Sequence, residues 1–228
     1  MQQEYEFYET ARAIVSFTDS YTQNKQGKQN EQPESESIPS ITKICSSLQF
    51  LRNQILSNNT CKQVIQIPKL LKSITTLSQY KIGIHIGQEL DQMRLEIRCN
   101  SRWCLFWIQV WGDEQDQSEL INKRYGRVTS ISFCTAGGVG EEQDDEIYNG
   151  LRSIYLFISE LHEGRNNDYK PSFQSLPLLA RRSEEQMEEE GANEEIEAQM
   201  NNNGYVGDIK NWANRVKAMI LNRFIYKR

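Results

Sequence analysis

Apolar residues recur every three or four positions along several stretches of the chain, the spacing that one buried face of an α-helix produces. The pattern predicts helices over residues 5–21, 41–59, 67–80, 147–164 and 208–225. Pro68 stands at a first-turn position of the third helix, where its missing N–H costs nothing. The predicted buried faces are Phe7, Ala11, Ile14, Val15 and Phe17; Ile41, Ile44, Leu48, Leu51 and Ile55; Ile67, Leu70, Leu71, Ile74 and Leu77; Ile147, Leu151, Ile154, Leu156, Ile158 and Leu161; and Ile209, Trp212, Val216, Met219, Ile220 and Phe224.

Residues 81–87, KIGIHIG, alternate apolar and polar positions as a strand would. The run is short and has no partner of similar quality, so we interpret it as a connection between helices. We therefore expect an all-α protein.

Three tryptophans, Trp103, Trp107 and Trp111, stand at i, i+4 and i+8 in the segment RWCLFWIQVWGDEQDQSELI, residues 102–121. Their neighbours are also apolar, which makes this predicted helix apolar almost all round, and such helices are usually buried. We expect Trp107 and Trp111 to pack in the core, and Trp103 to lie either in the core or on a binding face.

Three polar stretches, residues 22–37, 137–146 and 184–204, interrupt the helical pattern. Their low content of apolar side chains predicts flexible loops, the second running into the start of a helix. Long helices followed by polar breaks recur every few tens of residues, as in two- or three-helix solenoid repeats. We expect one repeat domain over residues 1–228.

The formal net charge of −5 argues against a protein that coats nucleic acid, because neutralising phosphates requires clustered Lys and Arg. No apolar run is long enough to span a membrane. The five cysteines lack the tight spacing of a zinc site and are expected as reduced, buried thiols. Neither histidine belongs to a recognisable catalytic arrangement, so we expect a non-enzyme without a metal or cofactor.

The segment LEIRCNSRWCLFWIQVWGDEQDQSELINKRYGRV, residues 95–128, resembles an armadillo repeat of the importin alpha family. In that family a long third helix carries Trp, then Leu, then Asn, and an acidic loop, a short helix and a Gly follow. Trp103, Leu105, residues 113–116 and Gly126 stand in those places. Residues 5–20, 47–58, 145–164 and 191–225 are similar to further repeats. The resemblance implies a right-handed armadillo-like solenoid.

The same resemblance implies binding of basic nuclear localisation peptides for nuclear import, in the cytoplasm and the nucleus. The family's Trp side chains stack on cargo lysines and its Asn side chains hold the peptide backbone. The positions that match these roles here include Asn53, Trp103, Trp107 and Glu160, and of these only Asn53 and Trp103 keep the family's residue type.

Residues 1–38 contain no basic cluster, so we do not expect binding of the import carrier. Because most of the Trp and Asn ladder is replaced, a second reading stands beside the adaptor. In it, the chain is a non-catalytic armadillo scaffold within a larger protein assembly and no longer carries classical cargo.

Overall fold

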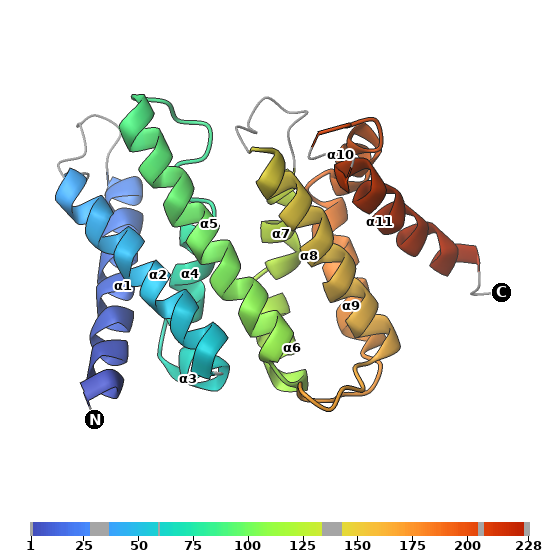
Figure 1. The fold of residues 1–228 in the computed structure, drawn as a ribbon, viewed down its shortest axis with the longest axis horizontal. Coiled ribbons are helices and arrows are strands. Elements are labelled where there is room, and N and C mark those ends of the chain that lie inside the picture. The colour runs from blue at the N-terminus through green and yellow to red at the C-terminus, as the bar shows by residue number, and fades with distance from the viewer. Residues whose placement is uncertain (1, 28–36, 59, 134–142, 205–207, 226–228) are drawn as a thin grey trace. The chain divides into compact units, whose positions relative to one another are not determined.

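The structure, a computed structural model, describes residues 2–27, 37–58, 60–133, 143–204 and 208–225, and these residues form eleven α-helices (Figure 1). Among them the only β-type pairing is an isolated bridge between Arg165 and Phe173. The expectation of an all-α protein is therefore confirmed. In chain order the helices are α1 (Gln2–Gly27), α2 (Ile38–Asn58), α3 (Cys61–Gln66), α4 (Leu70–Leu77), α5 (Gln88–Trp111), α6 (Glu114–Asn122), α7 (Tyr125–Phe133), α8 (Asp144–Glu163), α9 (Pro177–Glu188), α10 (Ala192–Gln199) and α11 (Asp208–Ile225).

The chain divides into two compact units, Met1–Lys123 and Arg124–Arg228. In the first unit α2 packs along α5, and α1 packs on both α2 and α4. The apolar face predicted for α2 is buried at all five positions, and the face predicted for α1 is buried at Phe7, Ala11 and Ile14. Periodicity alone thus identified the sides of these helices that form the core.

Residues 78–87 connect α4 to α5 without helix or strand, so the prediction of a connection over residues 81–87 is confirmed. Two buried arginines of α5 bind its backbone. Arg94 donates to the carbonyl oxygen of Ile84 at 3.0 Å, and Arg98 donates to that of Tyr80 at 3.3 Å. Because a buried charge is tolerated only where it is hydrogen-bonded, these contacts help to compensate the burial of the two guanidinium groups and fix the connection.

Helix α6 begins with a capping box. The side chain of Asp113 accepts hydrogen bonds from the backbone N–H groups of Gln115 and Asp116, and the Asp116 carboxylate accepts one from the Asp113 N–H at 2.8 Å. These bonds satisfy donors that the first turn of a helix otherwise leaves unpaired. Lys62 of α3 reaches Asp113 at 2.8 Å and joins the two short helices.

In the second unit α8 packs on α7, α9 and α11, and α10 packs on α11. Gly150 allows α7 to approach α8 closely, because a Cβ at this position would overlap the hydroxyl of Ser132. Gly164 ends α8 with φ 78°, a left-handed conformation that favours glycine. The buried face predicted for α8 is confirmed at five positions, and Leu156 is half-buried.

The structure corrects three predictions made from the sequence. Residues 184–204, expected to be a loop, hold the end of α9 and all of α10, because Met187, Ala192 and Ile196 supply just enough apolar surface to be buried. Residues 22–27, the start of another expected loop, continue α1, while residues 28–36 lie outside the described residues. Pro68 precedes α4, which begins at Leu70 after Lys69 adopts a left-handed conformation.

In the third expected loop, residues 137–142 lie outside the described residues and α8 begins at Asp144. A single repeat domain across both units stays a prediction. Within the described chain, no helix combines the length and the apolar character needed to cross a membrane.

Candidate functional site

The α2–α5 pair carries three of the four candidate residues, and the two helices run in the same direction. The Cys45 thiol donates to the Met93 carbonyl oxygen at 3.5 Å, and the Cys104 thiol donates to that of Leu48 at 3.7 Å. From the first contact to the second, the residue number rises on both helices, from Cys45 to Leu48 on α2 and from Met93 to Cys104 on α5. At a rise of about 1.5 Å per residue, Asn53 lies roughly 7.5 Å beyond Leu48 and Trp107 roughly 4.5 Å beyond Cys104, near one level of the pair.

Each helix of the pair presents a polar or aromatic stripe outside the buried contact. On α5 the stripe is Glu96, Asn100, Trp103 and Trp107, all exposed or half-buried. On α2 it is Ser46, Gln49 and Asn53, all exposed. On α5, Trp103 comes one residue before Cys104, which contacts α2. On α2, Ser46 and Gln49 come one residue after Cys45 and Leu48, which contact α5. Because one residue turns a helix by about 100° and the helices are parallel, both stripes lie on one side of the pair. We call this surface the α2–α5 face.

The indoles of Trp103 and Trp107 stack on the α2–α5 face with ring centroids 6.1 Å apart and planes 24° apart. Phe106 packs edge-on against both rings, at 5.3 and 5.0 Å. Trp103, Trp107 and Trp111 are all half-buried, so none lies fully in the core or fully in solvent. The indole N–H of Trp111 is buried and has no hydrogen-bond partner among the described residues. The first two rings therefore offer a fixed aromatic surface that remains open to a partner.

Asn53 is exposed on α2, and its amide makes no hydrogen bond to another described residue. It therefore keeps both its donor and its acceptor for a ligand. Sequence matching placed Trp107 where the importin alpha family has a second Asn, and an indole offers one donor and no acceptor. The face thus contains one amide and two indoles in place of paired Trp and Asn residues.

Two charged residues border the α2–α5 face. Burial raises the pKa of the Cys45 thiol to about 11, and the negative charge of Glu96 adds to that shift. Burial raises the pKa of Cys104 to about 12, and the positive charge of Arg52 opposes it. Because charges act on the thiols only from nearby, Glu96 and Arg52 both lie close to the seam between the helices. The face is thus aromatic and amide-bearing, with one acid and one base at its edge.

Glu160, the fourth candidate, belongs to α8 in the other unit and is already engaged. Its carboxylate contacts Arg165 at 3.3 Å, and the Arg165 side chain is 4% exposed. Arg165 also donates to the Pro171 carbonyl oxygen at 2.8 Å and lies over the Phe173 ring at 4.5 Å. The negative charge of Glu160 also contributes, after burial, to raising the pKa of Tyr125. These contacts give Glu160 a structural role in stabilising the turn after α8.

A second aromatic cluster, which sequence reasoning did not single out, joins α8 to α11. Trp212 packs edge-on against Tyr155 at 5.4 Å and against Tyr148 at 6.4 Å, and the Arg215 guanidinium lies 4.8 Å from the Trp212 ring. The seven-residue spacing of the tyrosines on α8 was its only signal in the sequence.

The cysteines, histidines and carboxylates of the described residues lie apart from one another or are paired. Among these residues, no group of three or more His, Cys, Asp or Glu side chains is arranged to hold a metal ion. Cys45, Cys61, Cys99 and Cys104 take part in no disulfide bond, and Cys134 lies outside the described residues. Both histidines pair with carboxylates: Nε2 of His162 lies 2.7 Å from Oε1 of Glu184, and Nδ1 of His85 lies 3.4 Å from Oδ2 of Asp91.

The chain was compared with models of protein families, with curated proteins and with solved structures, and it matches none of them.

Proposed function

We propose that this protein is a non-catalytic peptide-binding protein that holds a basic, extended peptide on the α2–α5 face. The observation that carries the proposal is the stacked, half-buried pair Trp103 and Trp107, on the same side of the helix pair as the free amide of Asn53. Large aromatic rings that remain accessible are frequent anchors of protein interfaces.

The chemistry of the face fits a basic side chain. An indole attracts a lysine or arginine cation above its ring by about 0.5–2 kcal/mol, depending on how far the cation is desolvated. Asn53 can donate to a peptide carbonyl and accept from a peptide N–H, which holds an extended backbone in register. Glu96 at the edge of the face adds an attraction that salt would weaken.

The order of the helices supports an armadillo-like repeat as the finer form of the fold. Two short helices and then a long one follow each other three times, as α3–α4–α5, α6–α7–α8 and α9–α10–α11. In our proposal these triplets are successive repeats, and the binding surface is the α2–α5 face of the first unit. On the importin alpha resemblance, the cargo would be a nuclear localisation peptide.

A titration of a lysine-rich localisation peptide tests the proposal. The wild type should bind it, and Trp103→Ala should weaken binding roughly 2- to 30-fold, the equivalent of one cation–π contact. Trp212→Ala, which removes a half-buried tryptophan of the other unit, is the matched control and should leave the affinity unchanged. Equal affinities for the wild type and Trp103→Ala would reject this use of the face.

A scaffold subunit of a larger assembly is the alternative, and the engagement of Glu160 by Arg165 favours it. If the fourth candidate position serves the fold, the candidate residues do not form a continuous ladder for a peptide. A wild type that shows no binding at tens of micromolar peptide, a range typical of weak recognition, and that copurifies with a stable protein partner would support the scaffold.

A further inference from the structure

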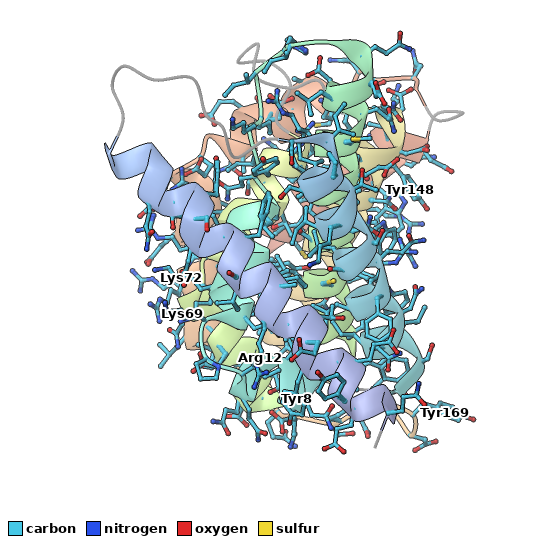
Figure 2. The ribbon with its side chains drawn as sticks, turned by 90° about the vertical axis from the view of Figure 1, so that its left-hand side faces the viewer. Tyr8, Arg12, Lys69, Lys72, Tyr148 and Tyr169 are labelled. Carbon is cyan, nitrogen blue, oxygen red and sulfur yellow. The ribbon has the colours of Figure 1, made fainter. Side chains whose placement is uncertain are left out.

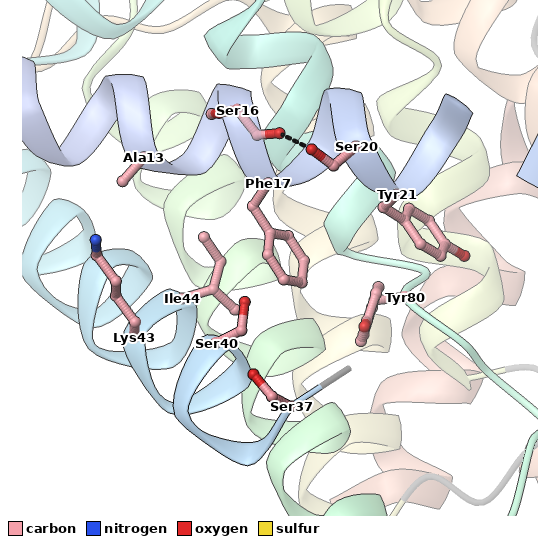
Figure 3. A pocket seen from close by; sticks show the side chains of 10 residues that line it. All are labelled: Ala13, Ser16, Phe17, Ser20, Tyr21, Ser37, Ser40, Lys43, Ile44 and Tyr80. Carbon is pink, nitrogen blue, oxygen red and sulfur yellow. Dashed lines mark hydrogen bonds between the residues drawn. The ribbon is translucent and has the colours of Figure 1, made fainter. Parts of the chain in front are cut away.

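A cavity of about 460 Å³ lies between α1 and α2, beside the connection that follows α4 (Figure 3). This volume falls within the range of roughly 300–1,000 Å³ that small-molecule sites occupy. The cavity is formed by α1 and α2, whereas the α2–α5 face uses other side chains of α2, so the two are separate sites. Its lining includes Phe17, Tyr21, Ser37, Ser40, Lys43 and Tyr80.

Three aromatic rings form one wall of the cavity. Tyr80 is 1% exposed and packs against Phe17 and Tyr21, with ring centroids 5.8 and 4.9 Å apart. Because Tyr80 is held this firmly, the wall is fixed before any ligand enters. Aromatic rings pair favourably with another ring in edge-to-face or offset arrangements, so the wall suits a flat aromatic ligand.

Four serines give the cavity hydrogen-bonding groups. The Ser20 hydroxyl donates to the Ser16 carbonyl oxygen at 3.0 Å, as the dashed line in Figure 3 shows. The hydroxyls of Ser16, Ser37 and Ser40 have no hydrogen-bond partner among the described residues. Each can therefore donate one hydrogen bond and accept others, which suits a ligand with a polar end.

The charge of the lining is positive. Lys43 is the one charged residue among the lining residues, and the first turn of α2 contains no acidic side chain. The partial positive charge at the start of α2 acts in the same sense as the Lys43 ammonium group. A negatively charged ligand is therefore favoured over a neutral or positive one.

From these three properties we propose that the α1–α2 cavity binds a small aromatic carboxylate. Its ring packs against Phe17, Tyr21 and Tyr80, while its carboxylate accepts hydrogen bonds from the serine hydroxyls and interacts with Lys43. This ligand site is independent of peptide binding on the α2–α5 face.

Calorimetric titration with 2-naphthoate and with its neutral amide, 2-naphthamide, tests the proposal. The wild type should bind 2-naphthoate with a Kd below about 1 mM and should bind the amide about two- to fivefold more weakly, as expected for one partly exposed ion pair. Lys43→Gln should remove that difference. Lys72→Gln, which makes the same change on α4 outside the cavity lining (Figure 2), should preserve it.

Ser40→Phe places a large side chain in the cavity and should abolish binding of both probes, while the melting temperature of this variant reports whether it remains folded. Because Lys43 is exposed, Lys43→Gln keeps the proposal testable even if Ser40→Phe unfolds. The proposal is overturned if the wild type binds neither probe below about 1 mM, if a folded Ser40→Phe variant binds as well as the wild type, or if Lys72→Gln has the same effect as Lys43→Gln.

Discussion

Substitution of Gly150 by alanine measures how tightly α7 and α8 are packed. The added Cβ would overlap the Ser132 hydroxyl and would lie 3.2 Å from Cδ1 of Phe133 and 3.3 Å from Cβ of Ser132. Overpacking of this kind costs roughly 1–3 kcal/mol, whereas alanine gains roughly 1 kcal/mol over glycine inside a helix. We therefore expect Gly150→Ala to lower the free energy of unfolding by roughly 0–2 kcal/mol, the difference of these two estimates.

A double-mutant cycle with Ser132→Ala separates the overlap from helix propensity. Ser132 is buried, and among the described residues its hydroxyl donates to the Thr129 carbonyl oxygen of its own helix, at 2.6 Å. The single substitution Ser132→Ala should cost about 1 kcal/mol for that bond. In the Ser132→Ala background the overlap is gone, so Gly150→Ala should cost at least about 1 kcal/mol less than in the wild type.

Urea denaturation followed by circular dichroism gives all four free energies of unfolding for the cycle. Gly87→Ala is a suitable control, because a Cβ there meets nothing within 4 Å. Additive effects of Gly150→Ala and Ser132→Ala, or a Gly150→Ala variant more stable than the wild type, would refute the close approach of the two helices.

Three further predictions concern the first unit. Burial raises the pKa of Cys45 to about 11 and that of Cys104 to about 12, so both thiols should resist a thiol reagent in the folded protein and react once it is unfolded. Rapid modification of either thiol in the native state, detected by peptide mass spectrometry, would contradict this. Asp113→Ala should lower the free energy of unfolding by about 1 kcal/mol at pH 7 through loss of the α6 cap. The hydrogen bond from Lys62 lowers the pKa of Asp113 in the folded state. The stability that Asp113 contributes is therefore present above its unfolded pKa of about 3.9 and is lost as the pH falls through the lower folded pKa. A stability difference between the wild type and Asp113→Ala that grows on acidification would contradict this. Trp107→Asn removes one ring of the stacked pair and should weaken binding of a basic peptide in a protein that stays folded. Thermal melting at a much lower temperature would show instead that the packing of Trp107 on Phe106 serves the core.

Periodicity predicted the long helices well because their apolar residues are many and regularly spaced. In α2 the predicted residues Ile41, Ile44, Leu48, Leu51 and Ile55 are all buried. The loop predicted over residues 184–204 was wrong for the opposite reason. A few apolar side chains in this segment, together with Gln186 and Glu195, are buried by neighbouring helices. Their burial is enough to stabilise α9 and α10. Such tertiary burial leaves little trace in a local pattern.

The candidate site shows the same division between what a pattern contains and what packing decides. The spacing of Trp103 and Trp107 predicted one helical face, and the structure places both indoles on one side of α5. Their stacking on each other and on Phe106 is decided by side-chain packing, which the spacing alone does not show. Likewise, nothing local to Glu160 indicated that Arg165 would engage it, or that Arg94 and Arg98 would be buried to hold a connection.

Hydrogen exchange of the backbone amides, measured with and without a lysine-rich peptide, tests the peptide-binding proposal most directly. Peptide bound on the α2–α5 face should slow exchange in the second half of α2, around Asn53, and in the part of α5 that contains Trp103 and Trp107. Trp103→Ala should reduce this protection, and added salt should weaken it. Protection confined to other helices, or no change in exchange at saturating peptide, would contradict the proposal.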